Sequence, residues 1–473
     1  MDRFASLFAG VLFLAALAGC EGDEGADDTG PPPADSGAPD AVAAEQGLPD
    51  VRADTVSACS PPCHPNATCK EDQGSHVCVC ASGTFGDGYA CTKEGRWIKH
   101  VVGKQAMATY IVVADVDKDG KLDIVSSNTS HMAEHKSEIA WFRNTGTATW
   151  DRIVVSPDTA PSPVINATGV AVADVDGDGA LDIVSAASGK PTSGTSTGGA
   201  VYWFQAPGSA GGAWKRFAIE EDAPTKYWKA YTLDPDGDSD PDIIVGGNSS
   251  AVLYVNPGKP ADPAASWSKS PLPQGTGIGI NLADVDGDGA LDVLSANRDA
   301  KKVAWVDIDA SGGALAYKET VVAASMEAAF DVVALDADGD KSLDLVVSKL
   351  FQAGVHWFEA PAAAGGAWTQ HTIDADFEGT DLYAGDIDGD GQPDLAVAGF
   401  NMGMGKLPSC VAWFQISQQG GKAVWTKHYI DYMSPAAPGD VSLDDINGDG
   451  HLDLVTTAVL AGEILWYENK PDK

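Results

Sequence analysis

One nine-residue motif recurs seven times along the chain of 473 residues and constrains the fold more than any other feature. The copies begin at Asp115, Asp174, Asp234, Asp284, Asp336, Asp386 and Asp445, and read DVDKDGKLD, DVDGDGALD, DPDGDSDPD, DVDGDGALD, DADGDKSLD, DIDGDGQPD and DINGDGHLD. Successive copies start 59, 60, 50, 52, 50 and 59 residues apart. Near-regular spacing of this kind indicates a repeat architecture, in which each repeat is one supersecondary unit.

Each repeat carries four short runs rich in Val, Ile and aromatic residues, which is the pattern of β-strands. In the first repeat we expect strands at 111–114, 122–126, 139–142 and 150–155. The third run holds an aromatic pair or its relative: Trp141-Phe142, Trp203-Phe204, Tyr254-Val255, Trp305-Val306, Trp357-Phe358, Trp413-Phe414 and Trp466-Tyr467. Four strands in each of seven repeats predict an all-β, seven-bladed β-propeller over residues 96–470.

The fourth run indicates how the ring closes. In six repeats it opens with an aromatic residue, namely Trp150, Trp214, Trp267, Tyr317, Trp368 and Trp425. The seventh run of this type, 97–102, stands before the first motif, and the last repeat ends after three strands. We therefore expect 97–102 to be the outer strand of the last blade, which removes an open sheet edge.

The acidic motif has the chemistry of a calcium loop. Asp at positions 1, 3, 5 and 9 gathers carboxylate oxygens in one turn, and calcium takes six to eight oxygen ligands. Position 12 is Ser126 or Val245 where an EF-hand has Glu, and a strand follows instead of a helix. The predicted ligands, with the position-7 carbonyl included, are Asp115, Asp117, Asp119, Lys121, Asp123, Asp174, Asp176, Asp178, Ala180, Asp182, Asp234, Asp236, Asp238, Asp240, Asp242, Asp284, Asp286, Asp288, Ala290, Asp292, Asp336, Asp338, Asp340, Ser342, Asp344, Asp386, Asp388, Asp390, Gln392, Asp394, Asp445, Asn447, Asp449, His451 and Asp453.

The overall charge agrees with this hypothesis. The chain has 68 Asp and Glu against 30 Lys and Arg, a formal net charge of -38, which disfavours nucleic-acid binding. Up to seven calcium ions would offset part of that charge. Three copies depart from the motif at Ser239, Lys341 and Asn447, and we expect weaker sites there. The alternative is that the loops use Asp and Gly for turn geometry alone.

A nine-residue acidic loop that leads into a strand resembles the FG-GAP and VCBS repeat families, which include the α-subunit propellers of integrins. The resemblance covers about residues 97–470 and is specific for the loop. It implies a propeller with calcium bound between the first and second strands of each blade. We expect these ions to be structural, because each would fix a loop and couple folding to metal binding.

Six cysteines fall between residues 59 and 91 with the spacing C-x3-C-x5-C-x8-C-x-C-x10-C. This is a disulfide framework and indicates an oxidising compartment, although spacing alone leaves 15 pairings open. The segment resembles an EGF-like domain, which implies the bridges Cys59–Cys69, Cys63–Cys78 and Cys80–Cys91. The residues before Cys59 lack the calcium-binding pattern of such domains. A rigid spacer is therefore favoured over a ligand-binding module.

The N-terminus has the pattern of a secreted lipoprotein. Residues 1–19 are expected to be a signal peptide, because 4–19 are apolar and end in small residues. Residues 17–20, Leu-Ala-Gly-Cys, resemble a lipobox, which implies an acylated Cys20, and 20–58 have the composition of a disordered linker. Secretion across the inner membrane and anchoring at the outer membrane or cell surface would follow. An ordinary signal peptide with an incidental Cys is the alternative.

The end of the propeller opposite the calcium loops is the expected binding face. There the loops after each second strand vary, and variable loops on a rigid scaffold are how binding faces are built. The candidate ligand residues, which could equally pack locally, are Trp228, Arg298, Lys349, Phe351 and Phe400.

These features predict a calcium-stabilised, monomeric surface protein that binds or adheres to a protein or glycan. One alternative is a carbohydrate-active protein. Some FG-GAP propellers resemble lectins, and the Trp-Phe phasing resembles certain sugar dehydratases and polysaccharide lyases. A structural envelope component is another.

Signals for catalysis are poor, so we expect no enzyme. His131–His135 matches H-x-x-E-H and 194–198 matches G-x-S-x-G, but both lie in loops without the helix that either motif needs. His100, His371 and His428 recur at one strand position and are expected to be structural. Cys410 is expected to be a buried thiol.

Overall fold

The computed structural model describes residues 67–72, 75–80, 84–85, 92–93 and 96–471, apart from 130–136, 157–165, 190–197, 209–211, 259–266, 313, 351, 353, 364, 401–408, 421 and 433–436. The signal peptide, Cys20 and the linker lie outside the described residues. So do Phe351, both enzyme-like motifs apart from Gly198, and the cysteine side chains of 59–91.

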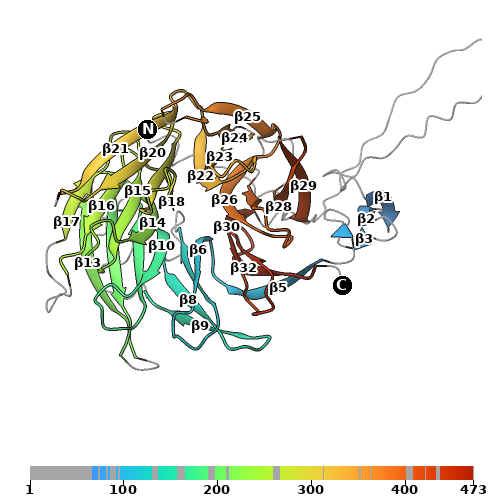
Figure 1. The fold of residues 1–473 in the computed structure, drawn as a ribbon. Coiled ribbons are helices and arrows are strands. Elements are labelled where there is room, and N and C mark those ends of the chain that lie inside the picture. The colour runs from blue at the N-terminus through green and yellow to red at the C-terminus, as the bar shows by residue number, and fades with distance from the viewer. Residues whose placement is uncertain are drawn as a thin grey trace, which may run out of the picture.

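Seven four-stranded antiparallel sheets stand radially about a central axis (Figure 1). Blade 1 is β6 (Ala108–Ala114), β7 (Asp123–Asn128), β8 (Ile139–Asn144) and β9 (Trp150–Val154). Blades 2 to 4 are β10 (Ala167–Ala173), β11 (Asp182–Ala187), β12 (Gly199–Gln205), β13 (Lys215–Ala223); β14 (Tyr227–Leu233), β15 (Asp242–Gly247), β16 (Val252–Val255), β17 (Ser268–Pro271); and β18 (Gly279–Ala283), β19 (Asp292–Asn297), β20 (Lys302–Asp309), β21 (Ala316–Ala323). Blades 5 to 7 are β22 (Ala329–Leu335), β23 (Asp344–Lys349), β24 (Val355–Glu359), β25 (Thr369–Asp374); β26 (Gly379–Gly385), β27 (Asp394–Gly399), β28 (Cys410–Gln418), β29 (Ala423–Tyr432); and β30 (Pro438–Asp444), β31 (Asp453–Ala458), β32 (Glu463–Asn469), β5 (Trp97–Lys104). The seven-bladed propeller is confirmed.

Burial explains the composition of each strand. The second strands, such as β7 and β11, are buried along their whole length, which suits their Val, Ile and small residues. The outer strands, such as β13, consist largely of exposed and half-buried residues and carry the charges. Neighbouring blades share their cores: Val346 and Trp357 of blade 5 pack with Leu395 and Phe414 of blade 6. Each such buried side chain stabilises the fold by roughly 1.5–3 kcal/mol.

The N-terminal strand completes the last blade, as expected. β5 pairs antiparallel with β32, with His100 opposite Trp466, and Figure 1 shows the two ends of the propeller chain side by side. Arg96 fixes the junction, because its Nε donates to Asn469 Oδ1 at 2.9 Å and its carbonyl accepts from Lys470 N.

The strand register corrects one sequence assignment. In blade 3, Ile243 pairs with Tyr254 and Ile244 with Leu253. In blade 1 the equivalent partners of β7 are Phe142 and Trp141. The pair in blade 3 is therefore Leu253-Tyr254, not Tyr254-Val255. Tyr254 takes the buried phenylalanine position, where its hydroxyl meets that of Tyr227 at 2.9 Å.

The segment before the propeller contains two short antiparallel pairs. β1 (Ala67–Asp72) pairs with β2 (Ser75–Cys80), and β3 (Thr84–Phe85) pairs with β4 (Thr92–Lys93). Over the described ranges, no helix has the length and apolar character needed to span a membrane.

Candidate metal centres

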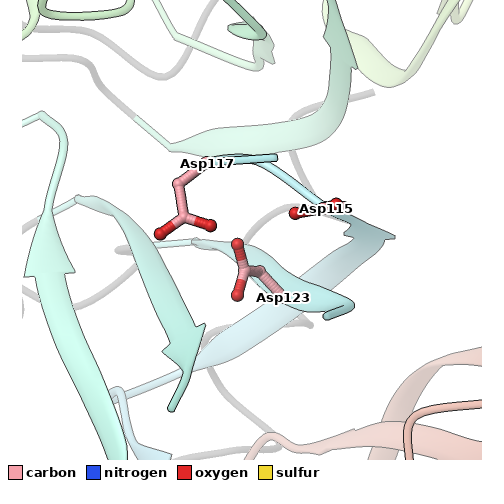
Figure 2. A group of neighbouring side chains, drawn as sticks. All are labelled: Asp115, Asp117 and Asp123. Carbon is pink, nitrogen blue, oxygen red and sulfur yellow. The ribbon is translucent and has the colours of Figure 1, made fainter. Parts of the chain in front are cut away.

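All seven acidic motifs connect the first strand of a blade to the second, so their loops lie at one end of the ring. Figure 2 shows the loop of blade 1, where Asp115, Asp117 and Asp123 come together between β6 and β7. Asp115 and Asp117 stand on the turn, and Asp123 begins the second strand.

The aspartates first fold their own loop. Asp115 Oδ1 accepts from Asp119 N and Asp115 Oδ2 from Gly120 N, each at 2.9 Å. The later carboxylates act in the same way over two residues: in blade 2, Asp178 N donates to Asp176 Oδ1 at 3.1 Å and Ala180 N to Asp178 Oδ1 at 2.7 Å. Each of these two later carboxylates accepts from the backbone through one oxygen, which leaves its second oxygen for another partner.

Positions 4 and 6 of the loop turn through the left-handed region of φ. Glycine holds most of these positions, as at Gly287 (φ 77°) and Gly289 (φ 93°). Three copies place a side chain there: Lys118 at φ 58°, Ser239 at φ 72° and Lys341 at φ 76°. Non-glycine residues in this region are strained. The sequence analysis noted Ser239 and Lys341 and missed Lys118.

The aspartate at position 9 is buried in every blade, and the seven are Asp123, Asp182, Asp242, Asp292, Asp344, Asp394 and Asp453. In blade 2, Asp182 accepts from Val175 N at 3.2 Å and from Ala206 N at 2.7 Å. Burial raises the pKa of Asp182 to about 7 and that of Asp123 to about 6, because desolvation outweighs these hydrogen bonds. The indole of Trp203 faces Asp182 and lowers its pKa, although its N–H does not meet hydrogen-bond geometry.

Carboxylate oxygens converge in at least five of these loops. Their ligand atoms lie within 4.8 Å of one another in the groups Asp115/Asp117/Asp123, Asp174/Asp176/Asp182, Asp234/Asp236/Asp238, Asp284/Asp286/Asp292 and Asp336/Asp338/Asp340. Asp242 Oδ2 and Asp453 Oδ2 are buried and have no hydrogen-bond partner among the residues that the structure describes. Orphaned carboxylate oxygens among others of the same charge are the donor set of a hard cation, so these residues fit calcium. Ser342 and the other position-7 residues donate their N–H to position 5.

A residue of the third strand distinguishes the loops, and the sequence analysis did not identify it. It follows the aromatic pair and is Arg143, Gln205, Val255, Asp307, Glu359, Gln415 or Glu468. Gln205 and Gln415 donate to Asp176 and Asp388 at 2.5 Å. In the sequence, this residue could have been found from its fixed position directly after the aromatic pair.

Two of these third-strand residues add negative charge to a loop. Asp286 raises the pKa of Asp307 in addition to the larger effect of burial. Glu359 likewise raises the pKa of Asp338. Its effect is smaller than those of burial, of the hydrogen bond from Asp340 N and of the Asp340 charge.

Blade 1 carries built-in cations. Lys121 Nζ lies 2.7 Å from Asp119 Oδ2, and Arg143 lies 3.7 Å from Asp117 Oδ2. The hydrogen bond from Lys121 is the largest influence on Asp119 and lowers its pKa. The seven loops therefore share a backbone design but differ in net charge.

At the opposite end of the ring, three blades contribute a connected set of side chains. Trp228 Nε1 donates to Asn248 Oδ1, and Asn248 Nδ2 donates to Asp299 Oδ2 at 3.2 Å. Arg298 lies 3.7 Å from Asp299 and stacks 5.6 Å over Phe330. Lys349 is half-buried at the end of β23. Phe400 is only 8% exposed.

The recurrent histidines pack as expected. His100, His371 and His428 stack on Trp466, Trp357 and Trp413, with ring centroids 4.3 to 4.5 Å apart. Cys410 is a buried free thiol. Burial raises the pKa of its thiol to about 12, which leaves it unreactive.

Comparison with known proteins gives two family matches. The FG-GAP-like repeat matches residues 115–185, 234–295, 284–347 and 336–397. The EGF domain matches residues 59–91. No curated protein sequence matches the chain.

Solved structures with a similar chain course include BBS1N in complex with ARL6DN, with a TM-score of 0.48, 12% identity, and 80% of this chain and 98% of that one covered. A protein from Lactobacillus plantarum has a TM-score of 0.46, 16% identity and coverages of 73% and 90%. The NanB sialidase from Streptococcus pneumoniae has a TM-score of 0.41, 11% identity and coverages of 80% and 71%. All three TM-scores are below 0.5, so nothing about this chain follows from them.

Proposed function

The propeller of this chain is built from FG-GAP-like repeats, and on that premise we propose that it is a calcium-stabilised binding protein displayed on a cell surface. In this proposal the metal ions hold the blades in shape, and a protein or glycan binds at the end of the ring opposite the metal loops. No catalytic step is part of the proposal.

The orphaned oxygens of Asp242 and Asp453 are the observation that carries the calcium proposal. Each belongs to a side chain at most 1% exposed, in a loop that holds further carboxylates. A buried, unpaired carboxylate oxygen costs free energy that a hydrogen bond or cation must offset. Up to seven Ca²⁺ ions, one in each loop, would provide that partner, and seven calcium-dependent loops would couple the stability of the whole ring to the ion.

Scanning calorimetry on chelator-stripped protein tests this proposal directly. We expect the melting temperature to rise when calcium is restored, because an ion that binds only the folded state stabilises it. Asp242→Asn and Asp453→Asn should each reduce the rise, whereas Asp309→Asn, an exposed aspartate outside the loops, should leave it unchanged. Identical melting with and without calcium would refute the metal role.

The set formed by Trp228, Asn248, Asp299, Arg298 and Phe330 supports the choice of binding face. It places indole, amide, carboxylate and guanidinium groups together across three blades. Mixed aromatic and polar surfaces of this kind bind glycans and protein side chains. A glycan array on the calcium-loaded protein separates the outcomes: saturable binding supports a glycan ligand, turnover of a glycan contradicts the proposal of a non-enzyme, and silence directs the search to proteins.

Display on a surface rests on the expected lipid at Cys20. Mass spectrometry of the mature N-terminus should find an acylated cysteine, and Cys20→Ser should move the protein from the detergent phase to the aqueous phase. An unmodified Cys20 in the mature protein would contradict the anchor and leave the calcium proposal intact.

A further inference from the structure

One residue of each inner strand, five positions before the acidic motif, occupies the same level of the propeller channel. The seven residues at this level, in blade order, are Tyr110, Gly169, Lys229, Gly279, Asp331, Asp381 and Asp440. Their registers agree: Tyr110 pairs with Ser127, Asp331 with Ser348 and Asp381 with Ala398. We refer to this level as the channel ring.

Lys229 spans the channel ring. Its Nζ lies 2.7 Å from Asp331 Oδ1 and 2.7 Å from Asp381 Oδ1, so a side chain from blade 3 reaches blades 5 and 6. The lysine side chain is 12% exposed and the Asp331 side chain 0%. The ring thus holds an ammonium group in a nearly dry environment, where it needs its anionic partners.

The ring holds three carboxyl groups and the single ammonium group of Lys229. Asp440, the third carboxylate, is only 7% exposed and accepts from Ile111 N at 2.7 Å through Oδ2. The Asp381 carboxyl is a direct neighbour of Asp440, and each of the two groups shifts the pKa of the other. Burial raises the pKa of Asp331 to about 7 and that of Asp381 to about 8.

A cavity of about 430 Å³ lies on the ring and extends toward the metal-loop end. Tyr110, Lys229, Asp381 and Asp440 line it at the ring, and Tyr231, Asn281, Tyr383 and Ser442 line it one level further on. Exposure rises in that direction, since Tyr383 is 38% exposed. The cavity therefore opens at the metal-loop end, and its floor of Lys229 and two carboxyl groups lies under walls of hydroxyl, amide and aromatic groups.

We propose that this cavity is a binding site for a small hydroxylated ammonium ligand, of the chemical class of an amino sugar. The ammonium group lies against Asp440 and Asp381 and displaces the proton that the buried Asp381 carboxyl holds near neutral pH. The tyrosine rings attract the same charge through their faces and stack on the apolar side of the ligand. The hydroxyls of Tyr231, Tyr383 and Ser442 and the amide of Asn281 match the ligand hydroxyls. A cavity of this size encloses one sugar ring.

Saturation-transfer NMR with glucosamine as the probe tests the site, with N-acetylglucosamine and glucose as matched ligands that lack the charge. The protein is calcium-loaded throughout, at about pH 6.5, where the amine of glucosamine is protonated. We expect saturable glucosamine binding that is at least tenfold tighter than binding of either neutral sugar. Equal binding of the three sugars, or binding of none, overturns the proposal on the unaltered protein, and neither result bears on the metal loops.

Variants locate the site. Asp440→Asn keeps an acceptor for Ile111 N, removes one charge, and should weaken glucosamine at least tenfold. Asp309→Asn removes a charge outside the cavity and should have no effect. Tyr231→Phe deletes a hydroxyl inside the cavity without a change of charge, and should weaken glucosamine by a smaller factor. Glucosamine binding that falls when calcium is raised tenfold would mean that the cavity takes the metal ion, which also overturns the proposal.

Discussion

Asp440 Oδ2 accepts a hydrogen bond from the backbone N–H of Ile111 at 2.7 Å, across 329 residues of sequence. The contact joins the inner strand of the last blade to that of the first. Asp331 makes the equivalent bond to Leu382 N at 3.0 Å, and Asp381 to Val441 N at 3.1 Å. The same carboxylates that form the channel ring thus tie blades 5, 6, 7 and 1 in sequence, and the β5–β32 pairing is a second closure at the outer rim.

Replacing Asp440 by Ala should destabilise the calcium-loaded protein by about 1–3 kcal/mol, because Ile111 N loses its acceptor in a buried position. Asp440→Asn keeps an acceptor and should cost less. Urea unfolding in excess calcium measures both, with Asp309→Asn, which keeps an acceptor for Ser311 N, expected to match the parent. Equal losses for Ala and Asn would show that charge, rather than the bond to Ile111, holds the closure.

Ser239→Gly and Lys341→Gly should each stabilise the protein by about 0.5–1 kcal/mol, since both residues sit at positive φ in a metal loop. The reverse change at the equivalent position, Gly289→Ser, should destabilise it. A Cβ at Gly289 would meet no atom within 4 Å, so only the backbone strain is introduced. Thermal melting with saturating calcium provides the comparison, and a stabilising Gly289→Ser would contradict the strain argument.

The loop of blade 1 should have the lowest calcium affinity, because Lys121 and Arg143 occupy the place of a bound cation. Lys121→Gln should tighten that site about two- to fivefold, as expected for removal of one exposed competing charge. Calcium titration by calorimetry measures the change, and Lys104→Gln, which pairs with Glu463 at the outer rim, is the matched control. An unchanged affinity in Lys121→Gln would indicate that the lysine moves aside freely.

The metal-free protein should lose stability as the pH rises from about 4 to about 7. In the folded state, burial raises the pKa of the position-9 aspartates, for example to about 7 at Asp182, Asp292 and Asp453. Between the unfolded and folded pKa values the native state therefore binds more protons, so stability falls with pH. Calorimetry across this range should show the fall without calcium and a smaller one with it. A flat profile in the metal-free protein would contradict the burial of these groups.

The repeats made the propeller predictable from sequence, because Asp at fixed positions and short runs of Val, Ile and aromatic residues are local signals. The closing strand 97–102 could be predicted by counting the strands of each repeat. The last repeat lacked its outer strand, and one strand of that type stood before the first repeat. The register of blade 3 was not predictable, since Tyr254-Val255 and Leu253-Tyr254 both suit a strand. Only the pairing with Ile243 decides between them.

The channel ring was missed for a different reason. The residues around Lys229, Asp331, Asp381 and Asp440 differ from one another, and no shared sequence motif marks the four positions. Their common feature is the distance of five residues to the next acidic motif. Aligning the seven copies on that motif would have revealed the shared position. It would not have revealed the contacts, because Lys229 of blade 3 reaches across the channel to partners in blades 5 and 6.

The outer strand of blade 7, β5, leaves the ribosome before any other strand of the propeller, and its partner β32 is the last strand of the propeller to emerge. Until then, β5 has no sheet to join and its backbone remains open to the wrong partner. Contacts of such long sequence separation form slowly. The ring can therefore close only after blade 7 has been synthesised. A chain that ends within blade 7 before β32 would leave β5, the first strand of the propeller, unpaired.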